Sequence, residues 1–129
     1  MVLTFRNMVS PPGQLNVNSR PLKLILERSG AVVQERDGAA QAIEALRSWR
    51  PDVLISDLAM RQEGGLALIA RIRALEDAEL RRIPAIAVSA HGPDVREHTL
   101  QAGFHEFIPK PVEAKTLLRT ILRVRALVE

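Results

Sequence analysis

Three polar side chains of different chemistry each stand at or just after the end of a short apolar segment. Asp57 follows the segment DVLIS, Ser89 ends the segment IPAIAVS, and Lys110 comes shortly after FHEFI. If these segments are parallel strands, their carboxyl ends meet at one rim of a sheet, which is where ligands and chemistry are found in open α/β sheets. The sequence therefore predicts that a carboxylate, a hydroxyl and an ammonium converge on one site.

The elements that would position these residues alternate between two kinds of periodicity. The strand candidates are short, apolar and rich in β-branched residues, as in a parallel sheet covered on both faces; they lie at 31–35, 52–56, 83–89 and 104–108. The helix candidates carry apolar residues at spacings of three and four; they lie at 21–28, 39–49, 66–75, 93–102 and 112–128. Gly64 and Gly65 indicate a turn before the third of these helices. This alternation predicts βαβ crossovers and a doubly wound α/β sandwich.

The N-terminal segment is less regular than the rest of the chain. Pro11 and Pro12 would remove hydrogen-bond donors from a strand ladder, so the segment 2–9 is the better candidate for the first strand. A long connection would then lead to a helix that begins near Asn18 or Ser19, both of which are good N-cap residues. We expect a single domain over residues 1–129, with an irregular N-terminal segment at 1–18.

Composition excludes several classes of protein. The chain has no cysteine, which rules out disulfides, thiolate metal sites and cysteine nucleophiles. Its eighteen Lys and Arg residues are interleaved with fifteen acids, and only four residues are aromatic, so we expect no nucleic-acid interface. No apolar run approaches the roughly 20 residues of a membrane span. We therefore predict a cytoplasmic protein that binds neither nucleic acid nor membrane.

The motifs around the three polar residues resemble a known family. The stretches PDVLISDLAM, AIAVSA and GFHEFIPKP, with Gly65 between the first two, are similar in order and separation to the receiver domain of two-component response regulators and hybrid sensor kinases. The resemblance covers residues 17–128. It implies a flavodoxin-like (βα)5 sandwich whose parallel sheet has the strand order 2-1-3-4-5.

The resemblance also implies roles for individual residues. Asp57 corresponds to the phosphoacceptor, which takes a phosphoryl group from the phosphohistidine of a histidine kinase or a phosphotransfer protein. Lys110 and Ser89 would hold the phosphoryl oxygens, and the backbone carbonyl of Ala59 matches a magnesium ligand. The family also has a cis peptide bond where this chain has Lys110–Pro111.

A switch to a partner surface is a further implication of the resemblance. Phe107 falls where the family places an aromatic residue that responds to phosphorylation of the aspartate. Its movement would alter the face formed by the helix at 93–102, the strand at 104–108 and the helix at 112–128. A downstream protein, or a second copy in a homodimer, would bind this face.

The sequence departs from the family pattern at the metal site. Two adjacent acids normally follow the first strand and hold the magnesium, but Gly13 and Gln14 occupy the expected positions. Magnesium requires near-octahedral oxygen coordination and usually depends on one or two carboxylates. With Asp57 and the Ala59 carbonyl as protein ligands, we expect Mg2+ to bind weakly.

Two functions of different class are consistent with these residues. The first is a phosphorelay receiver that is not an enzyme beyond its own phosphorylation and dephosphorylation, and the intact Asp57, Ser89 and Lys110 favour it. The second is a degenerate receiver that acts as a phosphorylation-independent interaction module, and the missing acids favour that one. The cognate kinase, the oligomeric state and whether the chain acts alone or within a larger protein do not follow from the sequence.

Overall fold

The sheet at the centre of the molecule has five strands. The structure, a computed structural model, describes residues 2–6, 22–59, 64–90 and 93–128, and the statements below concern these residues. The strands are β1 (Val2–Arg6), β2 (Val32–Arg36), β3 (Val53–Asp57), β4 (Ala85–Ser89) and β5 (Glu106–Pro109). They lie in the order β2-β1-β3-β4-β5, which confirms the predicted strand order.

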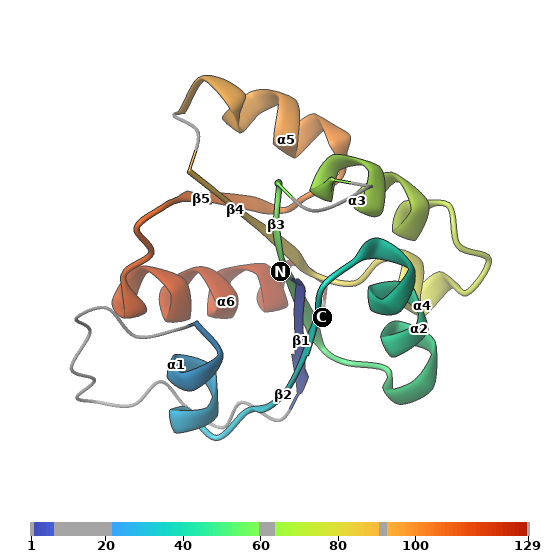
Figure 1. Cartoon of the computed structure of the whole chain (residues 1–129), viewed down its shortest axis with the longest axis horizontal. Coiled ribbons are helices and arrows are strands. Elements are labelled where there is room, and N and C mark those ends of the chain that lie inside the picture. Colours follow the sequence, from blue (N-terminus) through green and yellow to red (C-terminus); the bar gives the residue numbers. More distant parts are fainter. Residues whose placement is uncertain (1, 7–21, 60–63, 91–92, 129) are drawn as a thin grey trace.

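Helices cover both faces of this sheet, as the periodicity predicts (Figure 1). They are α1 (Leu22–Arg28), α2 (Ala39–Trp49), α3 (Gly65–Arg73), α4 (Ala78–Arg81), the 3-10 turn η1 (Pro93–Val95), α5 (Arg96–Ala102) and α6 (Ala114–Val128). One apolar core joins the sheet to α1 and α6, and a second joins it to α2 and α3. The doubly wound α/β class is therefore confirmed.

Strand β1 shows how the two cores share the sheet. Its side chains alternate between the faces: Leu3 and Phe5 pack in the core with α1 and α6, whereas Val2 packs in the core with α2 and α3. All three side chains are at most 1% exposed. Complete burial of an aliphatic or aromatic side chain contributes about 1.5–3 kcal/mol, so β1 is a substantial part of the core.

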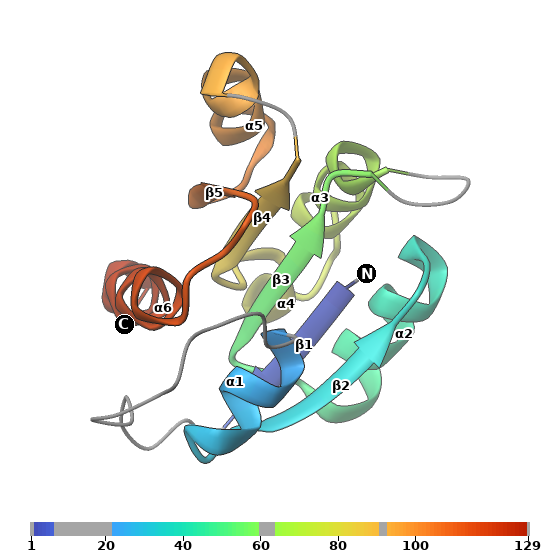
Figure 2. The ribbon, with the colours of Figure 1, turned by 60° about the vertical axis from the view of Figure 1, so that its left-hand side comes forward.

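The direction of β1 differs from the prediction of an all-parallel sheet. β1 pairs antiparallel with both neighbours, with Val2 opposite Ser56 of β3 and opposite Arg36 of β2. β3, β4 and β5 are parallel, as predicted. Figure 2 shows the consequence: β1 begins at the end of the sheet toward which β2 and β3 point. The sheet is mixed, and the prediction of a parallel first strand is wrong.

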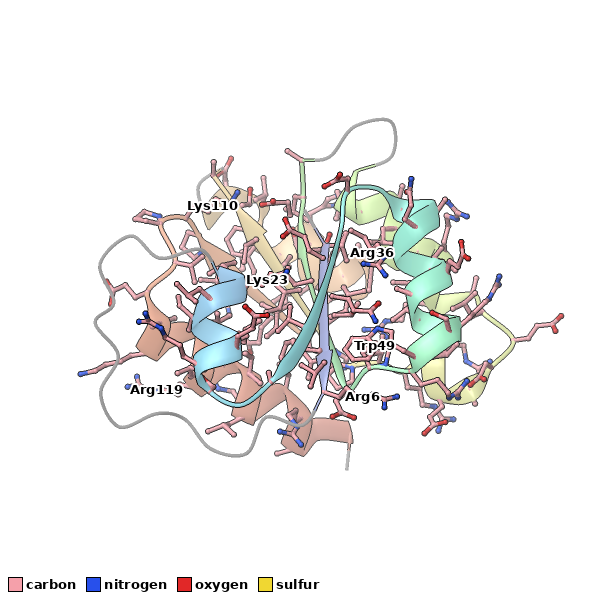
Figure 3. All side chains as sticks on the ribbon, turned by 60° about the horizontal axis from the view of Figure 1, so that its bottom comes forward. Arg6, Lys23, Arg36, Trp49, Lys110 and Arg119 are labelled. Atoms are coloured by element: carbon pink, nitrogen blue, oxygen red, sulfur yellow. The ribbon has the colours of Figure 1, made fainter. Side chains whose placement is uncertain are left out.

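Side-chain contacts hold the carboxyl end of β1 at the end of the sheet away from Asp57. The Trp49 Nε1–H at the end of α2 donates a hydrogen bond of 3.1 Å to Thr4 Oγ1. The guanidinium carbon of Arg6 lies 5.1 Å from the centre of the Trp49 ring, and Arg6 Nη2 donates to the Arg50 carbonyl at 3.2 Å. Arg6 and Trp49 lie together at the end of the sheet opposite Lys110 (Figure 3). A cation over an indole ring is favourable by about 0.5–2 kcal/mol, so these contacts anchor the last residues of β1 there.

Chain length also permits the reversed direction. Residues 7–21, which separate β1 from α1, lie outside the described residues. Fifteen residues can reach across up to about 50 Å, several times the length of a five-residue strand. The rule that fixes the direction and handedness of short crossovers therefore does not constrain β1.

Smaller differences concern the ends of elements. The predicted first strand at 2–9 is observed as a strand over Val2–Arg6, within the segment 1–18 that was expected to be irregular, and residues 7–9 lie outside the described residues. The region 93–102 divides into η1 and α5. Helix α4 was not predicted; the Asp77 side chain caps it by accepting hydrogen bonds from the backbone N–H groups of Glu79 and Leu80, at 3.0 and 3.2 Å. Within the described part of the chain, no helix combines the length and apolar character needed to cross a membrane.

Candidate functional site

The carboxyl ends of β3 and β4 deliver Asp57 and Ser89 to one rim of the sheet. The two strands are adjacent and parallel, with Asp57 opposite Val88. Hydrogen bonds extend the backbone pairing beyond the strand ends, because Leu58 N–H donates to the Val88 carbonyl at 3.1 Å and Lys110 N–H donates to the Ser89 carbonyl at 2.7 Å. These hydrogen bonds fix the residues that follow β3 and β5 to the end of β4, which lies between those two strands.

Asp57 and Lys110 form an ion pair at this rim. The Lys110 Nζ lies 2.6 Å from Asp57 Oδ1. The Asp57 side chain is 14% exposed and that of Lys110 is 43% exposed, so the carboxylate is largely shielded while its cationic partner faces solvent. The Lys110–Pro111 peptide bond is cis. The structure thus brings together a nucleophile of the carboxylate type and a positive charge suited to anionic oxygens.

Ser89 ends β4 beside the Asp57 strand and is only 5% exposed. Its hydroxyl can donate one hydrogen bond, the property that its predicted role requires. Ser56, which precedes Asp57, is fully buried and donates through Oγ to the Asp57 carbonyl at 2.8 Å. Serine side chains therefore lie on both of the neighbouring strand ends.

Phe107 lies on β5 and is 3% exposed, in the core that includes α2 and α3. Its backbone carbonyl accepts a hydrogen bond of 3.3 Å from Arg96 Nη1 of α5. On the same strand, Glu106 lies 3.7 Å from an Arg96 nitrogen and 3.5 Å from an Arg123 nitrogen of α6. The predicted partner face, which corresponds to α5, β5 and α6, is therefore tied together by polar contacts around β5.

The donor atoms at this rim do not fit the magnesium ion that the fold family implies. Gly13 and Gln14 lie outside the described residues, but neither carries a carboxylate. Ala59 is exposed just after β3, as a backbone ligand would need to be. Among the described residues, however, no group of three Asp, Glu, His or Cys side chains could hold a metal ion. Of the positions that match the family's metal ligands, Asp57 is the one that carries a carboxylate, and it already contacts Lys110.

Gly65 belongs to the motif that resembles the receiver family, but its contact with the Asp57 loop was not predicted. A Cβ atom at this position would lie 2.5 Å from the Asp57 carbonyl oxygen and 3.0 Å from Leu58 Cα. Gly65 N–H also donates to the Leu58 carbonyl at 2.9 Å. The first turn of α3 therefore packs directly on the backbone of the Asp57 loop. The adjacent glycines Gly64 and Gly65 were the available signal, but they indicate a turn without indicating what approaches it.

A five-stranded α/β sheet of order 2-1-3-4-5 is the flavodoxin-like arrangement, in which ligands bind at the carboxyl ends of the strands, where Asp57 and Lys110 meet. The family model described as the response regulator receiver domain matches residues 16–122. The chain belongs to this family, and it is a receiver domain of two-component signalling.

Individual relatives agree with this assignment. The chain is 30% identical over 107 residues to the polar-differentiation response regulator DivK of Brucella anthropi, which covers 81% of this chain and 85% of DivK. It is similar to the signal receiver domain of a signal transduction histidine kinase from Syntrophus aciditrophicus, with 31% identity and a TM-score of 0.72 over 84% of this chain and 81% of that one. It is also similar to the receiver domain of sensor histidine kinase PA1611 from Pseudomonas aeruginosa, with 29% identity and a TM-score of 0.60 over 70% and 74% of the two chains; that structure has a magnesium ion coordinated in its active site cleft.

Proposed function

We propose that Asp57 accepts a phosphoryl group from the phosphohistidine of a histidine kinase or a phosphotransfer protein. The observation that carries the proposal is the 2.6 Å contact between Asp57 Oδ1 and Lys110 Nζ at the carboxyl rim of the sheet. Membership of the receiver family supports it. The protein acts as a phosphoacceptor, and its own chemistry extends no further than phosphorylation and dephosphorylation of this aspartate.

The transfer exchanges one bond to phosphorus for another. A carboxylate oxygen of Asp57 attacks phosphorus, the P–N bond to the histidine ring breaks, and the ring nitrogen keeps the electron pair. Such transfer needs positioning and charge stabilisation more than covalent assistance. Lys110 supplies a positive charge at 2.6 Å from the nucleophilic carboxylate, and the Ser89 hydroxyl donates a hydrogen bond to a phosphoryl oxygen.

We expect Mg2+ to bind weakly to the free protein. Its ligands from the matched motif would be Asp57 and the Ala59 carbonyl, and Mg2+ requires octahedral oxygen coordination at about 2.0–2.1 Å. The magnesium in the PA1611 receiver domain supports a metal site at this rim as a family property. With Asp57 and the Ala59 carbonyl as the matched ligands, we expect this chain to bind magnesium more weakly than a receiver that has the two acids.

Phosphorylation would act on the face formed by α5, β5 and α6. A new dianion at Asp57 attracts hydroxyl and ammonium groups, and Ser89 lies on the strand next to Phe107. Phe107 then moves with Ser89, which alters the surroundings of Arg96 and Glu106 on this face. A downstream protein binds the altered face, or a second copy does so in a homodimer. We place the protein in the cytoplasm, acting without direct contact to nucleic acid or membrane.

The second candidate is a receiver that signals without phosphorylation. The absence of any Asp or Glu before Glu27 favours it, because the family uses two acids in that region for metal binding. Both candidates use the same partner face, so the state of Asp57 decides between them.

Mass measurement of the intact protein tests the proposal. The folded chain is incubated with phosphoramidate, whose P–N bond imitates that of phosphohistidine, alongside an Asp57→Asn variant of nearly identical shape. We expect one phosphoryl group on the wild type and none on the variant. Equal labelling of both proteins, or no labelling of either under any metal condition, would contradict the phosphoacceptor role and favour the phosphorylation-independent module.

A further inference from the structure

The antiparallel direction of β1 changes which residues lie next to Asp57. In the register of the sheet, Val2 is opposite Ser56 and Phe5 is opposite Val53. The amino end of β1 therefore lies at the rim that carries Asp57, and its carboxyl end, Arg6, lies at the other end of the sheet (Figures 2 and 3). The residue that reaches the rim from β1 is Val2, which is apolar and fully buried.

The N-terminal region supplies no carboxylate to this rim by any other route. Glu27, in the last turns of α1, is the first acidic residue of the chain. β1 and the whole connection to α1 therefore contain neither Asp nor Glu, whatever path the connection takes. Because neutral oxygens alone bind Mg2+ poorly, the missing acids have no substitute in this part of the chain.

Lys110 is a protein cation that lies beside the nucleophile. The Lys110 ammonium lies 2.6 Å from Asp57 Oδ1, and the carboxylate is 14% exposed. Arg36, opposite Val2 on β2, is engaged along its own strand, since its guanidinium donates to the Glu35 carbonyl at 2.7 Å and to Gln34 Oε1 at 2.8 Å. Lys110 is therefore the cation that the described structure aims at Asp57.

We infer that phosphorylation of Asp57 is independent of divalent cations and that Lys110 supplies the positive charge the reaction uses. The inference rests on the proposed phosphoacceptor function. Phosphoramidate reacts in the form that is protonated on nitrogen. As the P–O bond to Asp57 forms, its P–N bond breaks and the leaving group is neutral ammonia. The negative charge of the carboxylate passes to the acyl phosphate, whose oxygens then face the Lys110 ammonium.

Hydrolysis of the acyl phosphate follows the same logic. Water attacks phosphorus through a transition state with similar charge on the phosphoryl oxygens. A site without a metal therefore lacks the charge of that metal in the transition state of hydrolysis as well as in that of phosphorylation. The phosphorylated protein should therefore decay at one rate whether or not Mg2+ is present. A receiver of this kind should lose its phosphoryl group slowly when no partner is present.

The test is a time course of intact mass in phosphoramidate, with either excess EDTA or millimolar Mg2+. We expect the two labelling rates to agree within about twofold, because removing one stabilising charge typically changes such rates by tenfold or more. A rate that rises about tenfold or more with Mg2+ would overturn the inference and leave the proposed function intact. No labelling of folded protein under either condition would overturn both.

Variants of Lys110 provide the second arm, both measured in EDTA. Lys110→Gln should slow labelling by at least about tenfold, whereas Lys110→Arg, which keeps the charge, should retain more of the rate. Lys115→Gln makes the same charge change at an exposed position on α6 and should label like the wild type. Equal rates for Lys110→Gln and Lys115→Gln would overturn the role of Lys110.

Metal binding can be measured apart from the reaction. Mn2+, a paramagnetic substitute for Mg2+, is titrated into isotopically labelled protein, and the backbone amide signals of Leu58 and Ser89 are followed. We expect no selective broadening of these signals at submillimolar Mn2+. Selective broadening that disappears in Asp57→Asn would show a metal site at the nucleophile and would overturn the inference.

Discussion

His105 is a partly buried acceptor whose protonation opposes folding. Its Nδ1 lies 3.1 Å from the Ala85 backbone N–H, which donates to it, and 3.3 Å from Arg73 Nη2. Both neighbours are donors, so the network assigns the neutral ring, with its proton on Nε2. Burial lowers the pKa of His105, the charge of Arg73 lowers it further, and Glu106 partly offsets these effects.

The lowered pKa of His105 predicts a loss of stability in acid. An unfolded histidine has a pKa of about 6.5. Because the folded pKa is lower, the stabilising contribution is complete above about pH 6.5 and is lost as the pH falls through the folded value, by at most about 1.4 kcal/mol per pH unit. In His105→Asn, the amide oxygen can still accept from Ala85 but does not titrate.

Urea unfolding of both proteins between about pH 7.5 and 5 measures this difference. We expect the variant to be less stable by about 1 kcal/mol at pH 7.5, because one hydrogen bond is altered. The difference in the free energy of unfolding between the two proteins should become smaller as the pH falls below 6.5. There the wild type loses the contribution of neutral His105, whereas the stability of the variant does not depend on this titration. A difference that stays constant over this range would contradict the assignment of a neutral, partly buried His105.

At the scale of elements, the packing of α3 on the end of β3 is the contact that positions the Asp57 loop. Gly64 is the N-cap of α3, and Gly65 begins the helix. Because the Gly65 N–H donates to the Leu58 carbonyl at 2.9 Å, the helix start and the nucleophile loop are bonded directly. A side chain at Gly65 would have to separate them.

Gly65→Ala should therefore impair both stability and labelling. The added Cβ would meet backbone atoms, which cannot rotate away, and overpacking of this kind costs about 1–3 kcal/mol. Thermal unfolding and the rate of labelling by phosphoramidate are the measurements. Gly38→Ala is the matched control, since its Cβ would meet the end of the flexible Gln41 side chain, at 2.6 Å from Oε1. Equal effects of the two substitutions on labelling would contradict the positioning role of Gly65.

At the scale of the whole molecule, the direction of β1 is the feature that sets this receiver apart from the pattern its sequence predicts. The layers of helices and the parallel pairing of β3 with β4 follow from periodicity and the rules for βαβ crossovers, whereas the strand order is what the resemblance to receiver domains implies. The direction of β1 does not follow from periodicity, because a short, fully buried stretch such as VLTF carries no signal that distinguishes a parallel from an antiparallel strand. The meeting of Asp57 and Lys110 could be predicted because parallel strands end at one rim. The approach of Gly65 to the Asp57 loop could not, since it depends on the position of α3 in space.

Cysteine pairs can test the direction of β1, since the chain has no cysteine of its own. Arg6 lies opposite Val32 in the antiparallel ladder, and directly opposed residues have Cα separations of about 4.5–5.5 Å, within the range of a disulfide. Arg6→Cys with Val32→Cys should therefore form an intramolecular disulfide under mild oxidation. Arg6→Cys with Arg36→Cys, which a parallel strand would favour, should not. The reverse result, read from intact mass and non-reducing gels, would contradict the reversed strand.

The proposed signalling function depends on Asp57 being the phosphorylated residue. The most direct measurement is reductive trapping: protein labelled with phosphoramidate is treated with borohydride, which converts an aspartyl phosphate to homoserine, and the peptides are sequenced by mass spectrometry. We predict homoserine at position 57 of the wild type, with and without Mg2+, and at no position in Asp57→Asn. Homoserine at another residue, or its absence from folded, phosphoramidate-treated protein, would contradict the central claim.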